Sequence, residues 1–201
     1  MVFSTNTWRY RMTVTVETPE GIRTGSAVRE VKNYGGIPLF PQASSPQITV
    51  KGEAVVVDLG KRGLLFSLVD GDYGAGILFK LFPEKEKRGK VVLKPEQYPN
   101  FVRFRDINAP RTAENVRVPE EKIRFKREDP RRPVVTFEEA FGAGVSIKEV
   151  TMEITGDPVT PFDVERYLPW LASVRMNYIT GLNIDGPEWY QRLTGGDFER
   201  Q

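Results

Sequence analysis

The sequence predicts a β-rich α+β domain in which antiparallel hairpins form a sheet or a sandwich, with a few short helices packed on one side. Apolar residues recur at every second position in several short segments, and this is the period of a half-buried strand. The 18 glycines and 15 prolines are scattered along the 201 residues, which is typical of many short elements joined by turns. No shift in composition marks a boundary, so we expect residues 1–201 to form a single domain.

The first predicted strand, residues 8–17, has the cleanest alternation in the chain. The segment Thr18-Pro19-Glu20-Gly21 then predicts a turn, and residues 22–31 predict the return strand of a hairpin. Gly25 inside the return strand indicates a bulge or the close approach of another backbone. One face of the first strand should point into the core, and it carries Trp8, Tyr10, Met12, Val14 and Val16.

The next predicted elements are shorter. Residues 48–59 predict one long strand or two short strands broken near Gly52, and residues 64–69 pair back as a second hairpin. Thr136 is expected to cap a short helix that Gly142 ends. Further strands are predicted at 91–93, 101–105 and 145–154, a turn at 106–110, and short helices at 75–82 and 137–141.

The clearest helix start lies at residues 160–163. Thr160 is the expected N-cap, Pro161 occupies the first helical position, and Asp163 completes the capping box. Pro169 should kink or break this helix. The alternative is an extended loop held by Pro158 and Pro161, with an exposed Thr160. The apolar stripe of the helix would consist of Val164, Tyr167, Leu168 and Leu171.

The composition excludes several kinds of chemistry. The chain has no histidine, so it lacks an imidazole acid or base. It has no cysteine, so thiolate nucleophiles, disulfides and zinc sites built from nitrogen and sulfur ligands are excluded as well. A net charge of +2 gives no global attraction to nucleic acid, and we expect no nucleic-acid partner. No dinucleotide-binding or P-loop spacing is present, and we expect neither a cofactor nor a metal.

No apolar run approaches the ~20 residues that span a bilayer, and residues 1–7 lack the features of a signal peptide. Several segments in this order nevertheless resemble a family of uncharacterised proteobacterial proteins, many of which carry a membrane anchor or are described as lipoproteins. The resemblance implies no activity. It implies a periplasmic or envelope location if an anchor has been removed from this chain; otherwise we expect a cytoplasmic protein. The segments are residues 11–31, 51–59, 99–110, 144–160 and 168–171.

Two carboxylate motifs are candidate binding sites. Asp70-Gly71-Asp72 has the spacing of calcium ligands, although Gly74 stands where a third oxygen ligand should follow; the alternative is a solvated turn. Asp106 and Asn108 form the second candidate, and their alternative is a pair of side-chain turns before Pro110. The predicted binding residues are therefore Asp70, Asp72, Asp106 and Asn108, and no catalytic residue is assigned.

Three functional classes remain open. We favour a non-catalytic binding or scaffold module, with a protein as a possible partner and the bacterial envelope as a possible location. The alternative is a carboxylate-based enzyme such as a carbohydrate-active hydrolase, in which Glu53, Asp58 and Asp106 would supply the acid and base. The third class is a nucleic-acid binder using the basic residues of 124–132, but acidic residues interrupt that stretch and favour a solvated loop.

Overall fold

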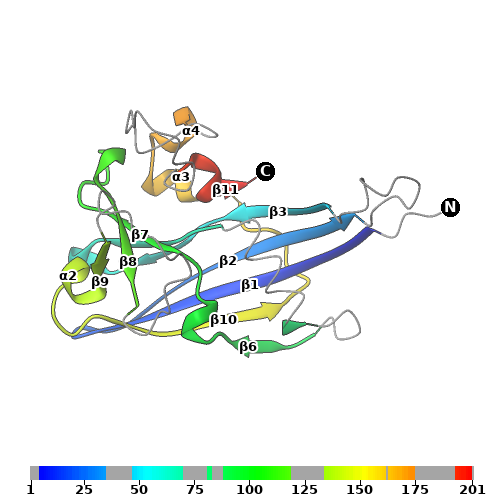
Figure 1. Cartoon of the computed structure of the whole chain (residues 1–201), viewed down its shortest axis with the longest axis horizontal. Helices are drawn as coiled ribbons and strands as arrows, with labels where there is room; N and C mark the ends of the chain where they lie inside the picture. The colour runs from blue at the N-terminus through cyan, green and yellow to red at the C-terminus, as the bar shows by residue number, and fades with distance from the viewer. Residues whose placement is uncertain are drawn as a thin grey trace.

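The computed structural model describes residues 5–34, 47–69, 81–82, 88–118, 134–161, 163–174 and 193–200. Asp70 and Asp72 lie outside these residues, as do the charged stretch at 120–133 and most of the helix predicted at 75–82. The described chain has the predicted β-rich α+β fold (Figure 1). Among the helices of these segments, none has the length and apolar character needed to cross a bilayer.

The described strands form two sheets. The larger sheet has the order β11 (Glu199–Arg200), β3 (Gln47–Glu53), β2 (Gly21–Tyr34), β1 (Thr5–Thr18), β10 (Ser146–Ile154) and β6 (Lys90–Val92). The smaller sheet has the order β4 (Val55–Asp58), β5 (Leu64–Ser67), β7 (Phe101–Phe104), β8 (Ala113–Arg117) and β9 (Val134–Thr136). These neighbours run antiparallel, as predicted, except that β8 and β9 are parallel.

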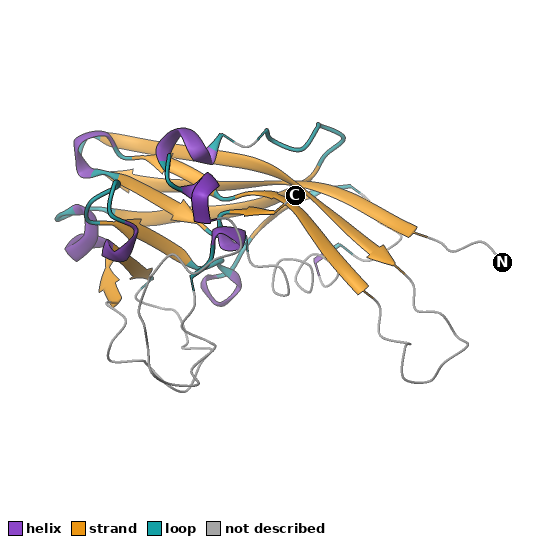
Figure 2. Ribbon diagram, turned by 90° about the horizontal axis from the view of Figure 1, so that it is seen from above, coloured by secondary structure: helices purple, strands orange, loops and turns teal. Residues whose placement is uncertain are grey.

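Short helices complete the described fold, and most of the helical turns lie toward the end of the molecule opposite the N-terminus (Figure 2). The α-helices are α2 (Phe137–Phe141), α3 (Val164–Tyr167) and α4 (Leu171–Val174). The 3₁₀ turns are η1 (Gly60–Arg62), η2 (Pro95–Gln97), η3 (Pro110–Thr112) and η5 (Gly195–Asp197).

The first hairpin confirms the predicted register. Thr18 pairs with Gly21 across a two-residue turn, and the pairing continues without a shift to Thr5 and Tyr34. Because strand side chains alternate between faces, this register sends every second residue of β1 into the core. The five residues predicted to face inward are each no more than 3% exposed: Trp8, Tyr10, Met12, Val14 and Val16.

Two apolar clusters divide the described fold into three layers. The first cluster lies between the two sheets, and the second lies between the smaller sheet and the C-terminal segments. In β5, Leu65 belongs to the first cluster and the next residue, Phe66, belongs to the second, so this strand is covered on both faces. Figure 1 shows α3 and α4 on one side of the molecule, next to β11, and the apolar residues of these two helices, together with Leu193 and Phe198, supply the third layer.

The crossing from one sheet to the other occurs between β3 and β4. Gly52 has a φ of +136°, which favours glycine and turns the chain away from β2 near the predicted break. The close approach predicted at Gly25 is confirmed, because a Cβ atom added there would lie 2.0 Å from the carbonyl oxygen of Val56 in β4. The two sheets therefore meet backbone to backbone along this side.

The helix predicted at 137–141 is confirmed with both of its ends. The Thr136 hydroxyl accepts from the amide of Glu139 at 3.2 Å, and the Glu139 carboxylate accepts from the amide of Thr136 at 2.8 Å. These hydrogen bonds lower the pKa of Glu139, the one from the Thr136 amide most strongly. Gly142, with a φ of +98°, follows the last turn. Three strands were not predicted from the sequence: β8, β9 and β11.

The capping role predicted for Thr160 is wrong. Helix α3 begins at Val164, its N-cap is Asp163, and the side chain of Asp163 makes no capping hydrogen bond. Thr160 instead binds β2: its hydroxyl accepts from the amide of Val28 at 2.7 Å, and its amide donates to the Val28 carbonyl at 3.1 Å. Because β3 turns away at Gly52, Val28 has no partner in β3, and Thr160 satisfies both of its backbone groups.

Candidate functional site

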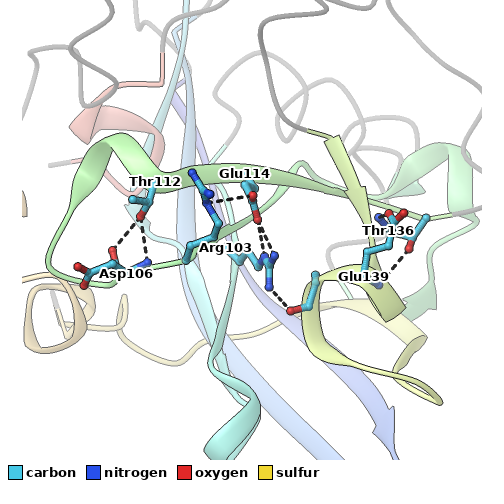
Figure 3. Close-up of polar contacts among 8 residues, drawn as sticks. Arg103, Asp106, Thr112, Glu114, Thr136 and Glu139 are labelled. Atoms are coloured by element: carbon cyan, nitrogen blue, oxygen red, sulfur yellow. Dashed lines mark hydrogen bonds and ion pairs between the residues drawn. The ribbon is translucent and has the colours of Figure 1, made fainter.

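Asp106 and Asn108, the two predicted binding residues that the structure describes, lie in the turn between β7 and η3. Figure 3 shows Asp106 in this turn. The amide of Asn108 donates to Oδ1 of Asp106 at 2.9 Å, and the amide of Asp106 donates to the Thr112 hydroxyl at 3.0 Å. This hydroxyl has two carbonyl acceptors for its single proton, Ala109 at 2.7 Å and Asp106 at 2.9 Å. The local turn expected as the alternative is therefore present, and a binding role for Asp106 and Asn108 stays a prediction.

A buried carboxylate next to this turn has a structural role. Glu114 of β8 accepts from the Arg103 guanidinium at 2.7 Å and forms a second ion pair with Arg105 at 3.2 Å (Figure 3). Arg103 also donates to the carbonyl of Ala140 and lies over the ring of Phe141. These contacts join β7 and β8 to α2, because one arginine reaches both a strand and the helix.

A fully buried arginine lies between the two sheets. Arg29 is only 1% exposed, and its guanidinium donates to the carbonyls of Glu53 at 2.9 Å and Ser67 at 3.0 Å. Its Nη1 atom also lies 3.5 Å from the sulfur of Met12. Arg29 thus links β2 to β5 and to the end of β3, and every one of these contacts is structural rather than open to a ligand.

The carboxyl group of Glu53 lies at the junction of the sheets with α3. Glu53 is 4% exposed, and its Oε2 atom accepts from the amide of Val164 at 2.9 Å. Burial raises the pKa of Glu53 to about 7, and the neighbouring charges of Asp163 and Glu199 act in the same direction. The backbone amide of Val164 at the start of α3 therefore finds its acceptor in a side chain of β3 that is 111 residues away in the sequence.

The outer face of the larger sheet carries a row of alternating charges. Arg9 of β1 lies opposite Glu30 of β2, and Glu30 lies opposite Lys51 of β3. Glu30 accepts from Nε of Arg9 at 2.8 Å and pairs with Lys32 at 3.2 Å. The hydrogen bond from Arg9 is the main cause that lowers the pKa of Glu30, so this carboxylate stays ionised.

A pocket of about 340 Å³ lies on this row and has residues 158–161 as its wall. The wall is anchored to the sheet at two points. The amide of Thr155 donates to the carbonyl of Arg9 at 3.0 Å, and Thr160 makes its two bonds to Val28. The charged floor and the largely apolar wall thus come from segments far apart in the chain. The pocket is lined by Arg9, Glu30, Lys51, Pro158, Val159, Thr160 and Pro161.

The chain matches no family model, no curated protein and no solved structure. The resemblance to uncharacterised proteobacterial proteins therefore stays a prediction, and the function must be argued from geometry. Charged and apolar groups converge in this pocket around a space that a ligand can enter, so we take it as the candidate site.

Sequence patterns did not identify this pocket, although part of the signal was present. The turn at Thr18-Pro19-Glu20-Gly21 has two central residues, and a two-residue turn fixes which residues of the two strands lie opposite each other. That register places Arg9 against Glu30. The third charge, Lys51, and the proline-rich wall come from segments whose position depends on tertiary packing, so no local pattern could have placed them.

Proposed function

We propose that this protein is a non-catalytic binding module and that the pocket on the outer face of the larger sheet is its binding site. The observation that carries the proposal is the state of the pocket's carboxylate. Glu30 is paired with both Arg9 and Lys32, and its pKa is lowered. A carboxylate held ionised by two cations is a poor general acid, whereas a fixed pattern of charge is suited to orienting a ligand.

The alternative, a carboxylate-based hydrolase, receives less support from the described residues. Such an enzyme needs an acid with a raised pKa that faces a second carboxylate across the substrate. Glu53 has the raised pKa, but its carboxyl group is buried, is bonded to the amide of Val164, and does not line the pocket. The acid and the pocket are thus separate features, and this separation favours binding over hydrolysis.

A fragment screen tests the pocket while its ligand is still unidentified. We expect a library of small organic fragments, screened by amide chemical-shift mapping on the ¹⁵N-labelled protein, to give hits that shift the amides of Lys51, Val159 and Thr160. Val159→Trp should fill the pocket and abolish these shifts. Thr24→Trp is the matched control, because Thr24 is exposed on the same face of β2 but does not line the pocket.

Two results would refute the proposal. Hits that persist unchanged in Val159→Trp would place binding elsewhere, and turnover of any hit would show that the protein is an enzyme. The envelope location is a separate part of the proposal and rests on the resemblance alone. It is checked by fractionating cells that produce the full-length gene product, and recovery from the cytoplasmic fraction alone would contradict it.

A further inference from the structure

The charges around the pocket are not balanced. On the outer face of β1, β2 and β3, the paired cations are Arg9 and Lys32, both bound to Glu30. Arg11 pairs with Asp157 near the rim. Lys51 is exposed and has no ion pair within the described part of the chain. Lys51 therefore has no local counter-ion among the described residues, and Arg9 and Lys32 share the single charge of Glu30, so this row carries an excess of positive charge.

Arg9 also has N–H groups that make no hydrogen bond within the described residues. A guanidinium has five N–H groups, and the one on Nε points to Glu30 at 2.8 Å. This bond leaves the two terminal amino groups without an acceptor among the described residues. Arg9 and Lys51 lie on either side of Glu30 in the same cross-strand row, and both line the pocket.

The remaining residues that line the pocket are mostly apolar. Pro158, Val159 and Pro161 present largely apolar surface, and the two bonds of Thr160 to Val28 hold them against the sheet. A wall fixed by backbone hydrogen bonds loses little entropy when a ligand binds. A volume of about 340 Å³ is at the lower end of the range of small-molecule sites, and it suits an aromatic or short aliphatic body with one polar head group.

We infer that the pocket binds a small organic anion whose carboxylate contacts Lys51 and Arg9 and whose apolar body packs on the proline-rich wall. This inference rests on the proposed function and adds the chemical class of the ligand. The charge of the head group follows from the uncompensated ammonium and the remaining guanidinium donors, since both favour an oxyanion. The apolar body follows from Pro158, Val159 and Pro161.

The test uses matched pairs of acids and amides: benzoate with benzamide, phenylacetate with phenylacetamide, and butyrate with butyramide. Each is titrated into the ¹⁵N-labelled protein at low salt. We expect at least one acid to shift the amides of Lys51, Val159 and Thr160, and its neutral amide to bind about tenfold more weakly, as expected for loss of a charge-assisted hydrogen bond. Phenyl phosphate forms a further arm, and tighter binding than phenylacetate would identify phosphate as the oxyanion.

Lys51→Met removes the ammonium and keeps the length of the side chain, and it should weaken binding of the acid about tenfold. Lys90→Met is the control, because Lys90 is also an exposed cation of the larger sheet but does not line the pocket. Equal binding of acids and amides at the pocket would overturn the inference and leave the proposed function intact. Failure of every acid, every amide and every library fragment to shift these amides would overturn both.

Discussion

Replacing Gly25 with alanine should destabilise the protein strongly, although Gly25 lies in an ordinary strand. A Cβ atom at this position would lie 2.0 Å from the carbonyl oxygen of Val56, 2.8 Å from its carbonyl carbon and 3.2 Å from Cγ1 of Val55. Contacts shorter than 3.0 Å essentially do not occur for real Cβ atoms, so β2 and β4 would have to separate by about 1 Å. The atoms in the way belong mostly to a backbone and cannot rotate aside.

The size of the effect follows from what moves with β4. Val55 and Val57, which flank Val56, are fully buried in the first apolar cluster, and β4 is paired with β5 along all four of its residues. Overpacking a core typically costs 1–3 kcal/mol, and here the strain falls on a backbone between two sheets. We therefore expect Gly25→Ala to cost about 3 kcal/mol, which for a protein of this length lowers Tm by roughly 6–12 °C.

Urea and thermal denaturation measure this loss, and Gly156→Ala is the matched control. Nothing lies within 4 Å of a Cβ atom added at Gly156, and its φ is outside the left-handed region. The control should therefore be neutral or stabilising by up to about 1 kcal/mol. A Gly25→Ala protein that unfolds within 1 °C of the wild type, with an unchanged urea slope, would refute the close approach of β2 and β4.

Three further predictions concern buried polar groups. The folded-state pKa of Glu53 is raised from 4.5 to about 7, so ionising Glu53 destabilises the folded protein as the pH rises through this window. Glu53→Gln should therefore stabilise the protein by about 2 kcal/mol at pH 8, a value reduced for solvent screening, and should have little effect at pH 4.5. Urea titrations at both pH values check this, and an equal gain at both would contradict it. Thr160→Val should cost about 1 kcal/mol by leaving the amide of Val28 without its acceptor, whereas an unchanged urea midpoint would argue against that bond. Glu114→Gln should cost about 3 kcal/mol because it leaves two arginines without their counter-ion, and a loss under 1 kcal/mol in the same assay would mean that the ion pairs are not significant.

The sequence predicted those parts of the fold that are determined over short distances. The inward face of β1 followed from its period of two, and the register of the hairpin is compatible with its two-residue turn. The cap and the end of α2 followed from Thr136 and Gly142, because both act within one helical turn. The close approach at Gly25 was predicted as one of two options, since a glycine inside a strand indicates either that or a bulge.

Features that depend on distant partners could not be predicted in this way. Arg29 occupies an inward position of β2 between Ala27 and Val31, and its burial becomes possible only because the carbonyls of Glu53 and Ser67 accept hydrogen bonds from its guanidinium. β9 has only three residues and pairs in parallel with β8, so it carries no detectable alternation of its own. The pocket on the outer face of the larger sheet likewise combines three strands with a late loop, and its shape follows from their packing.

The error at Thr160 shows how a local rule is overruled. A threonine before Pro161 and an aspartate three residues later satisfy the pattern of a capping box. The departure of β3 from β2 leaves two backbone groups of Val28 to be satisfied, and Thr160 satisfies both. Satisfying two buried backbone groups outweighs the gain from one helix cap. The helix then begins later, at Val164, with Glu53 as its acceptor.

The pairing of the first strand with a late one has a consequence for how the protein is made. Residues 10–17 of β1 pair with β10, so that Tyr10 lies opposite Ile154, and the end of β3 pairs with β11, where Glu53 lies opposite Glu199. On the ribosome, β3 soon follows to pair with β2, whereas the other edge of the first hairpin, β1, has no partner until β10 has been made. Such non-local pairing makes folding slow. Until its partners are made, the nascent hairpin exposes apolar surface that can aggregate or bind a chaperone.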